Sequence, residues 1–267
     1  MSHLKNNESS NRSGRDELGI RQPTKPIGKS WFLGIGIDAY RYFSPLNNAV
    51  RDVKAIAEVL QQDYDLESGQ CRFLLNDAAT RRGILKALRG LVTEIKEDDK
   101  LIIYYSGHGS LNARKRGFWV PVDAEKGEEE TYVSNGRLRE LIADIHSRHT
   151  LLISDSCFSG TFFVRGASRS DLAADELESR VSRWAICSGR SDEEVADGAP
   201  GGHSPFCASI LNELKLNQNA KLRVASLADR VVEVTRANYE QLPEGNPLQG
   251  VGHMGGQYVF HRRSTDA

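Results

Sequence analysis

Two short polar segments contain side chains that could carry out nucleophilic chemistry, and each follows an apolar run. Cys157 follows the run 151–153, and His108, which lies between two glycines, follows the run 101–105. A thiol with an ordinary pKa of about 8.5 is only slightly ionised at neutral pH, but a nearby imidazole can accept its proton. The pair would then attack a carbonyl carbon, with His108 acting as base and later as acid.

The two apolar runs predict the elements that must bring these side chains together. Each run is too short for a helix and ends in small polar residues, which is typical of a buried strand. Open α/β sheets place their chemistry at the carboxyl ends of their strands. If the two strands lie side by side and parallel, with the residues between them forming the crossover, the thiol and the imidazole meet at one edge of the sheet.

The two polar segments also resemble motifs of a known family. Segments 106–109 (Ser-Gly-His-Gly) and 155–160 (Asp-Ser-Cys-Phe-Ser-Gly) together resemble the caspase and metacaspase superfamily of cysteine peptidases. His108 lies 49 residues before Cys157, close to the spacing of about 50 residues found in caspases. The cysteine follows Asp-Ser and not the Gln-Ala of animal caspases, so the resemblance is closest to the bacterial metacaspase-like branch.

The resemblance implies that His108 and Cys157 form a catalytic dyad in a caspase-like fold. It also implies an oxyanion hole made by the backbone N–H groups of Gly109 and Cys157. Either dyad residue alone would more often be an ordinary core or surface residue, but two strand-end motifs with matched spacing favour the dyad. No third residue that would orient His108 is evident, and His146 and His149 are expected at the surface.

Asp155 is the main indication of substrate preference. It lies two residues before Cys157 in an extended segment, so both side chains should point the same way. A carboxylate there would pair with Arg or Lys at the P1 position, the residue before the cut, and repel an acidic residue. Alternatively, Asp155 only accepts hydrogen bonds from loop amides. The resemblance implies an S1 pocket made by Asp155, Asp52 and Ser106, although Asp52 could simply complement the dipole of the helix that begins near it.

Apolar periodicity alternates between strands and helices along the chain. Strands are predicted at 30–37, 71–75, 100–106, 183–188 and 257–261, in addition to the cysteine strand, and helices at 46–62, 80–95, 135–147, 205–216 and 224–239. With 267 residues, one main domain is expected. The alternation predicts an α/β fold with a mostly parallel central sheet of about six strands and helices on both faces.

The globular domain is expected at residues 30–262, between a flexible N-terminal arm at 1–29 and a tail at 263–267. By resemblance, a large-subunit-like part ends near residue 160 and a small-subunit-like part covers 183–262.

A polar loop at 161–182 is expected to join these two parts, and loops of this length are usually functional or disordered. An enzyme with an acidic S1 pocket would cut such a loop in its own chain, because a tethered segment is present at high effective concentration. The candidate cleavage positions are Arg165, Arg169 and Arg180.

Composition excludes several classes of function. The chain has 35 basic and 36 acidic residues, so no nucleic-acid partner is expected. No apolar segment approaches the roughly 18 residues of a membrane span, and the N-terminus lacks the apolar region of a signal peptide. The cysteines form no CxxC pair, which together with these features indicates a reducing, cytoplasmic location. They are Cys71, Cys157, Cys187 and Cys207.

No cofactor or metal is expected. The Gly-Ile-Gly segment at 34–36 resembles a dinucleotide-binding motif, but Pro45 interrupts the helix that the motif requires. Many calcium-activated metacaspases carry two acids where residues 132–136 here read Tyr-Val-Ser-Asn-Gly, which offers few of the carboxylate oxygens that calcium prefers. Calcium dependence is therefore not favoured, although nearby acids could substitute: Asp123, Glu125, Glu128, Glu129 and Glu130.

The favoured interpretation is a cysteine endopeptidase that cuts protein substrates after Arg or Lys. By resemblance, it would be a bacterial protease effector in stress, cell death or antiphage defence, activated by a protein partner or by self-cleavage. One alternative is a catalytically idle caspase-like module that binds a partner, against which the intact His108 and Cys157 argue. A nucleotide-dependent α/β enzyme is the third and least favoured.

Overall fold

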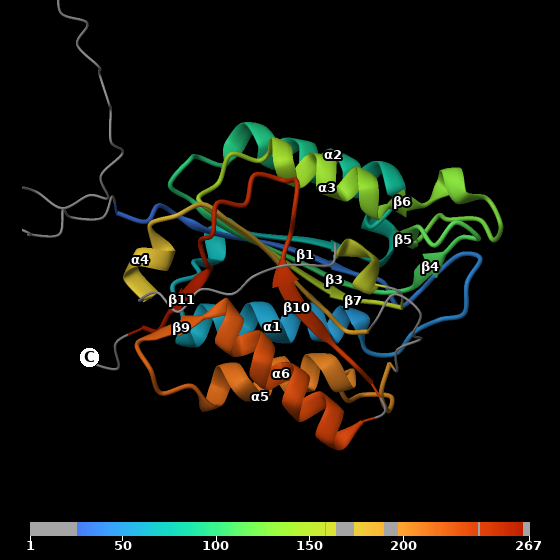
Figure 1. The fold of residues 1–267 in the computed structure, drawn as a ribbon. Coiled ribbons are helices and arrows are strands. Elements are labelled where there is room, and N and C mark those ends of the chain that lie inside the picture. Colours follow the sequence, from blue (N-terminus) through green and yellow to red (C-terminus); the bar gives the residue numbers. More distant parts are fainter. Residues whose placement is uncertain (1–25, 158, 164–173, 190–196, 240, 264–267) are drawn as a thin grey trace, which may run out of the picture.

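A sheet of six strands forms the centre of the molecule (Figure 1). The computed structural model describes residues 26–157, 159–163, 174–189, 197–239 and 241–263. In spatial order the strands are β10 (Glu244–Pro247), β8 (Ser182–Cys187), β7 (His149–Asp155), β3 (Lys100–Ser106), β1 (Ser30–Gly36) and β2 (Cys71–Leu75). All neighbouring pairs are parallel except β10 with β8. The predicted α/β fold with a mostly parallel sheet is confirmed.

Helices cover both faces of this sheet. In Figure 1, α2 (Arg81–Glu94) and α3 (Asn135–Asp144) lie on one face, and three helices lie on the other: α1 (Ala49–Asp63), α5 (Pro205–Leu216) and α6 (Val224–Asn238). Successive side chains of each strand point to opposite faces of the sheet, and so toward different helix layers. In β7, Leu151 and Ile153 pack in the core beneath α1, α5 and α6, whereas Leu152 packs in the core beneath α2 and α3.

The two strands that were predicted to carry the chemistry lie at the centre of the sheet. All seven residues of β3 and all seven of β7 are buried, as expected for strands covered on both faces. The strands pair in parallel, and their last residues, Ser106 and Asp155, are direct partners in the register. His108 and Cys157 therefore each follow the paired strand ends by two residues.

Two small sheets lie beyond the ends of the central one. Strands β4 (Gly109–Leu111), β5 (Gly117–Trp119) and β6 (Val133–Ser134) form one sheet at the edge that carries His108, and β9 (Lys221–Arg223) pairs with β11 (Val259–His261) near the opposite edge (Figure 1). The short helix α4 (Ala174–Glu178) lies at that opposite edge as well.

Two predictions about elements were wrong. The segment 257–261 does not close the central sheet, because β11 pairs antiparallel with β9 outside it. The sixth strand is β10, whose sequence Glu-Gly-Asn-Pro has no strand signature; Pro247 is tolerated there because β10 is an edge strand. The predicted loop 161–182 contains α4, which buries Leu177 completely. Two helix bounds also differ by three residues: α1 begins at Ala49, and α3 ends at Asp144.

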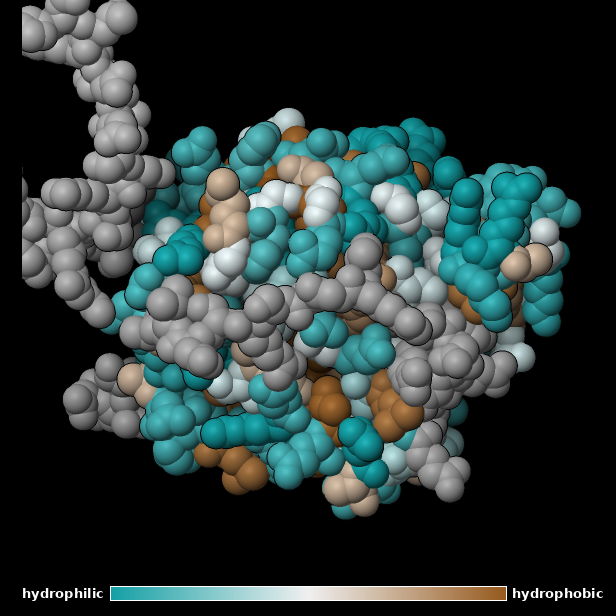
Figure 2. Space-filling model, viewed as in Figure 1, coloured by the Kyte–Doolittle hydropathy of each residue, from teal (hydrophilic) through white to brown (hydrophobic). Residues whose placement is uncertain are grey.

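Hydrophilic side chains cover most of the face seen in Figure 2, and hydrophobic residues appear there in small separate patches. Within the part of the chain that the structure describes, no helix combines the length and the apolar character needed to span a bilayer.

Candidate active site

A small pocket at the carboxyl ends of β3 and β7 brings the predicted dyad together. It is lined by Leu46, Ser106, Gly107, His108, Asp155, Cys157, Asp197 and Ser204. The strand register explains this meeting, because Ser106 and Asp155 are paired and the loops that follow them leave the sheet side by side. Of the residues predicted for catalysis and for S1, only Asp52 and Gly109 are not part of this lining.

His108 is held from several sides. Its Nε2 lies 2.8 Å from the carbonyl oxygen of Ser44, which can only accept, so Nε2 donates and Nδ1 of the neutral ring is left as the proton acceptor. The imidazole packs against the rings of Tyr40 and Phe43, at centroid distances of 4.7 and 5.9 Å. Tyr105 Oη donates to the carbonyl oxygen of His108 at 2.7 Å. The missing orienting group is thus a backbone carbonyl, which no residue type in the sequence could reveal.

Gly109 brings the backbone of the histidine loop against that of the cysteine loop. A Cβ at Gly109 would lie 2.0 Å from the carbonyl oxygen of Cys157 and 3.2 Å from its nitrogen, so only glycine fits at this position. Cys157 itself is half-buried, and the four cysteines form no disulfide among the described residues. The two backbones proposed to supply the oxyanion hole are therefore in direct contact.

Asp155 lines the pocket, while Asp52 lies behind it. Asp155 is 5% exposed and accepts a hydrogen bond from Ser204 Oγ. Asp52 is fully buried; its Oδ2 accepts from the backbone N–H of Ser204 at 3.1 Å, and its Oδ1 lies 2.5 Å from His203 Nδ1. Burial raises the pKa of each carboxyl to about 7. Asp52 lies in the first turn of α1, but its carboxylate bonds to His203 and Ser204, in the segment before α5.

Sequence reasoning missed two polar residues of the pocket, Asp197 and Ser204. Asp197 Oδ2 accepts from the backbone N–H of Asn47 at 2.6 Å, and its charge raises the pKa of Asp52 and Asp155 further. Ser204 is the N-cap of α5, and a serine just before a predicted helix was a usable signal. Asp197 had none, since it lies in a polar stretch without periodicity. No Lys or Arg is found among the described residues that line the pocket.

The candidate cleavage positions lie in different situations. Arg180 precedes β8, whose first residue pairs with the first residue of β7. Arg180 therefore lies at the amino ends of these strands, whereas Cys157 lies at their carboxyl ends. The Arg180 side chain forms an ion pair with Glu176 at 2.8 Å. Arg165 and Arg169 lie outside the described residues.

His146 is exposed as predicted, but the surface prediction for His149 was wrong, since it is fully buried in β7.

The segment 132–136 has a structural role in the described molecule. Ser134 caps α3 by accepting from the N–H of Arg137, and Asn135 Nδ2 donates to Thr161 Oγ1 at 2.6 Å. Asp123 accepts from the N–H of Arg81 at 2.9 Å, at the start of α2. Among the described residues, the one group of His, Cys, Asp and Glu side chains close enough to hold a metal ion lies elsewhere, at Asp52, His203 and Cys207.

Comparisons with known proteins identify the family of the chain. A family model described as the caspase domain matches residues 29–247. The chain is 28% identical to metacaspase-1 of Botryotinia fuckeliana over 152 residues, which are 50% of this chain and 35% of that protein. It is also 28% identical to metacaspase-1 of Cryptococcus neoformans over 174 residues, covering 56% of this chain and 36% of that protein. The chain thus spans about a third of the length of these curated relatives.

Two solved structures share the fold. Caspase-1 of Spodoptera frugiperda superimposes with a TM-score of 0.66 at 12% identity, over 96% of this chain and 99% of that one. A protein of Geobacter sulfurreducens superimposes with a TM-score of 0.62 at 17% identity, over 86% of this chain and 99% of that one. At such low identities, the likeness shows the fold alone.

Proposed function

The chain belongs to the caspase-domain family, and from this membership we propose that it is a cysteine endopeptidase with Cys157 as nucleophile and His108 as general base and acid. The observation that carries the proposal is the meeting of both side chains in one pocket, with His108 Nε2 held by a backbone carbonyl. That hydrogen bond leaves Nδ1 as the acceptor for the thiol proton.

The proposed reaction follows acyl transfer to a thiol. His108 Nδ1 takes the proton of Cys157, and the thiolate attacks the peptide carbonyl carbon. The backbone N–H groups of Gly109 and Cys157 stabilise the oxyanion, a role supported by the contact between their backbones. His108 then gives its proton to the leaving amine. Water hydrolyses the thioester, with His108 again acting as base, and the free thiol is restored.

The proposed preference is for Arg or Lys at P1. Asp155, Asp197 and Ser106 line the pocket without a Lys or Arg among its described lining residues. A guanidinium or ammonium group in the pocket would supply a counter-charge for the buried Asp155. Asp52 lies behind the pocket and adds to its negative potential. Its carboxylate also accepts a hydrogen bond from the backbone N–H of Ser204. An aspartate at P1 would be repelled by the same carboxylates.

The proposed biological role rests on the resemblance to metacaspases. In this proposal the protein is a cytoplasmic bacterial effector in stress, cell death or antiphage defence, activated by a partner protein or by cutting its own chain. Arg165 and Arg169 follow the nucleophile more closely than Arg180 does. Because Arg180 lies at the far edge of the sheet, a cut there would be made by a second molecule.

A thiol-directed peptidyl-Arg probe tests the endopeptidase against the idle binding module. The probe should label wild-type protein at Cys157, as located by peptide mapping, and a matched peptidyl-Asp probe should not. His108→Ala should lower the labelling rate strongly because the thiol then lacks its base. A folded wild-type protein that neither probe labels at Cys157 would favour the idle module.

A further inference from the structure

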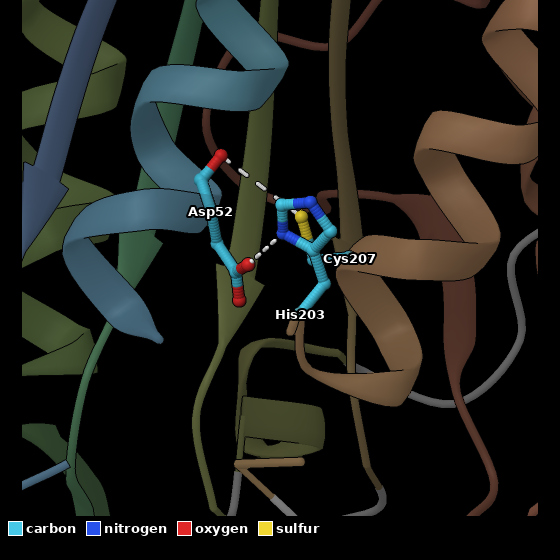
Figure 3. Close-up of side chains that lie close together, drawn as sticks. All are labelled: Asp52, His203 and Cys207. Carbon is cyan, nitrogen blue, oxygen red and sulfur yellow. Dashed lines mark hydrogen bonds and ion pairs between the residues drawn. The ribbon is translucent and has the colours of Figure 1, made fainter. Parts of the chain in front are cut away.

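Three potential metal ligands converge beside the S1 pocket. Figure 3 shows Asp52 of α1 together with His203 and Cys207, which come from the segment that leads into α5 and from its first turn. One ligand atom from each side chain lies within 4.8 Å of the other two. His203 Nδ1 is 2.5 Å from Asp52 Oδ1, and Cys207 Sγ is 3.9 Å from the carbonyl oxygen of Asp52.

The three atoms suit zinc in type and in spacing. Zn²⁺ binds thiolate, imidazole and carboxylate at about 2.0–2.3 Å in tetrahedral geometry, which places ligand atoms roughly 3–4 Å apart. The observed separations, 2.5 Å between His203 Nδ1 and Asp52 Oδ1 and at most 4.8 Å among the three atoms, bracket this range. Asp52 and Cys207 are fully buried, whereas the His203 side chain is 31% exposed and borders an open surface hollow, so an ion has a path to the site.

Two features of the surroundings favour a charged sulfur. The Tyr104 hydroxyl is fully buried and lies against Cys207, and its interaction with the sulfur lowers the pKa of the thiol against the larger, opposite effect of burial. It would donate a hydrogen bond to a thiolate. Cys207 is also in the first turn of α5, where its N–H donates to Ser204 Oγ at 2.9 Å, and helix N-termini stabilise thiolates. Without a metal, burial raises the pKa of the Cys207 thiol and keeps it protonated.

The local charge also calls for a cation. Asp52 is buried beside Asp155, and Asp197 lies near both carboxylates. Arg51 and Lys215 act on His203 from the exposed side, but no ion pair joins either of them to Asp52 in the described part of the chain. A divalent ion bound to Asp52 would offset the desolvation of this carboxylate.

We propose that Asp52 Oδ1, His203 Nδ1 and Cys207 Sγ form a Zn²⁺ site, with a water molecule as fourth ligand. Binding replaces the proton of the Cys207 thiol by the metal, and that proton is released to solvent. The site is separate from His108 and Cys157. If the proposed specificity is correct, the ion also reduces the pull of Asp52 on a basic P1 side chain, so zinc binding and binding of an Arg substrate oppose each other.

Cobalt titration of catalytically dead protein tests the site directly. Cys157→Ala removes the nucleophile as a competing ligand, and Co²⁺ bound by a thiolate absorbs through sulfur-to-metal charge transfer. The Cys157→Ala protein should show this absorption, and Zn²⁺ should abolish it by displacement. Adding Cys207→Ser should remove the absorption. Cys71 is half-buried and belongs neither to the dyad nor to the proposed metal site. Adding Cys71→Ser should therefore leave the absorption unchanged.

His203→Ala supplies a second variant that depends less on core packing. In the Cys157→Ala background it should weaken Co²⁺ and Zn²⁺ binding by about tenfold or more, because one ligand is lost. Circular dichroism would confirm that each variant is folded. Absence of the absorption in Cys157→Ala, its persistence after Cys207→Ser, or an unchanged affinity after His203→Ala would each overturn the proposal. Because the assay uses inactive protein, its failure would leave the peptidase proposal untouched.

Discussion

At the residue scale, the reactivity of the proposed dyad depends on groups that belong to no motif. The carbonyl oxygen of Ser44 fixes the tautomer of His108, and Tyr40 packs against the imidazole ring while its hydroxyl accepts the N–H of His108 at 2.7 Å. The pocket acid Asp155 is bound by Ser204, a residue 49 positions later in the chain. Groups from distant parts of the sequence thus hold the side chains of the site in place.

Cys157→Ala and His108→Ala should each abolish peptide cleavage without unfolding the protein. Both side chains lie beyond the strand ends and are only half-buried, so the loss of stability should be small compared with the roughly 2–5 kcal/mol for truncating a buried leucine. Turnover of an Arg peptide and thermal unfolding would be measured on the same preparations. A folded variant with nearly wild-type turnover would refute the dyad.

Asp155→Asn should change how stability depends on pH. Burial raises the pKa of Asp155 to about 7, above the unfolded value of about 3.9, so the folded protein holds this proton more tightly. The contribution of Asp155 to the free energy of unfolding is greatest below about pH 4 and is lost as the pH rises through 7. The unfolding free energy of wild type minus that of Asp155→Asn should therefore fall over this range, by up to about 1.4 kcal/mol per unit of pKa shift.

Comparing the two proteins is necessary because another buried group works in the opposite direction. Burial lowers the pKa of His149 to about 3, so its contribution to stability rises with pH and is the same in both proteins. Denaturant unfolding at several pH values would give the difference. A difference that is constant with pH would show that Asp155 is not titrating as a buried carboxyl.

At the element scale, the strands β3 and β7 do most of the positioning, and Gly109 controls how their two loops meet. Gly109→Ala would place a methyl group 2.0 Å from the Cys157 carbonyl oxygen, so the loops must separate. A displacement of about 1 Å can cost about 100-fold in rate, so kcat/KM should fall by that order or more.

Gly136→Ala provides the matched control. Gly136 lies in α3, and a Cβ there would meet only Ser134 Oγ at 3.9 Å. Activity should remain, and stability should rise by up to about 1 kcal/mol because alanine is the better helix former. Equal activity of the Gly109→Ala and wild-type enzymes would show that the close contact of the two loops does not matter for catalysis.

The sequence predicts the central elements well because their signals are local. The apolar runs of β3 and β7, the Thr80 cap of α2 and the glycines around His108 all follow rules of short range. The strand β10 escaped prediction because Glu-Gly-Asn-Pro pairs only by virtue of its place at the sheet edge. Asp197 and the Ser44 carbonyl escaped for the same reason, since only the folded chain brings them to the pocket.

At the scale of the whole molecule, the sheet separates the pocket from one candidate cleavage position. Cys157 lies beyond the carboxyl end of β7, whereas Arg180 precedes the amino end of β8. Seven residues of strand at about 3.3 Å each span roughly 20 Å between these edges. Self-cleavage at Arg180 within one molecule is therefore incompatible with the intact sheet, and a cut there should depend on protein concentration.

Incubated wild-type protein should cut itself after Arg165 or Arg169. Fragments of roughly 18 and 11 kDa are expected from the 29.6 kDa chain, and they should stay associated because the central sheet contains strands from both. Intact-mass spectrometry would follow the reaction, with Cys157→Ala as the control. A wild-type chain that remains whole while it cleaves Arg peptides would remove self-cleavage from the mechanism, and nicks shared with Cys157→Ala would indicate a contaminating protease.

Cleavage-site profiling on a diverse peptide library is the most direct test of the central claim. Wild-type protein and the Cys157→Ala variant would be incubated with the same library, and the products would be sequenced by mass spectrometry. We predict cuts after Arg or Lys in the wild-type sample and none in the variant. Cuts after Asp, cuts shared by both samples, or no cuts by the folded wild-type protein would contradict an Arg- or Lys-specific cysteine endopeptidase.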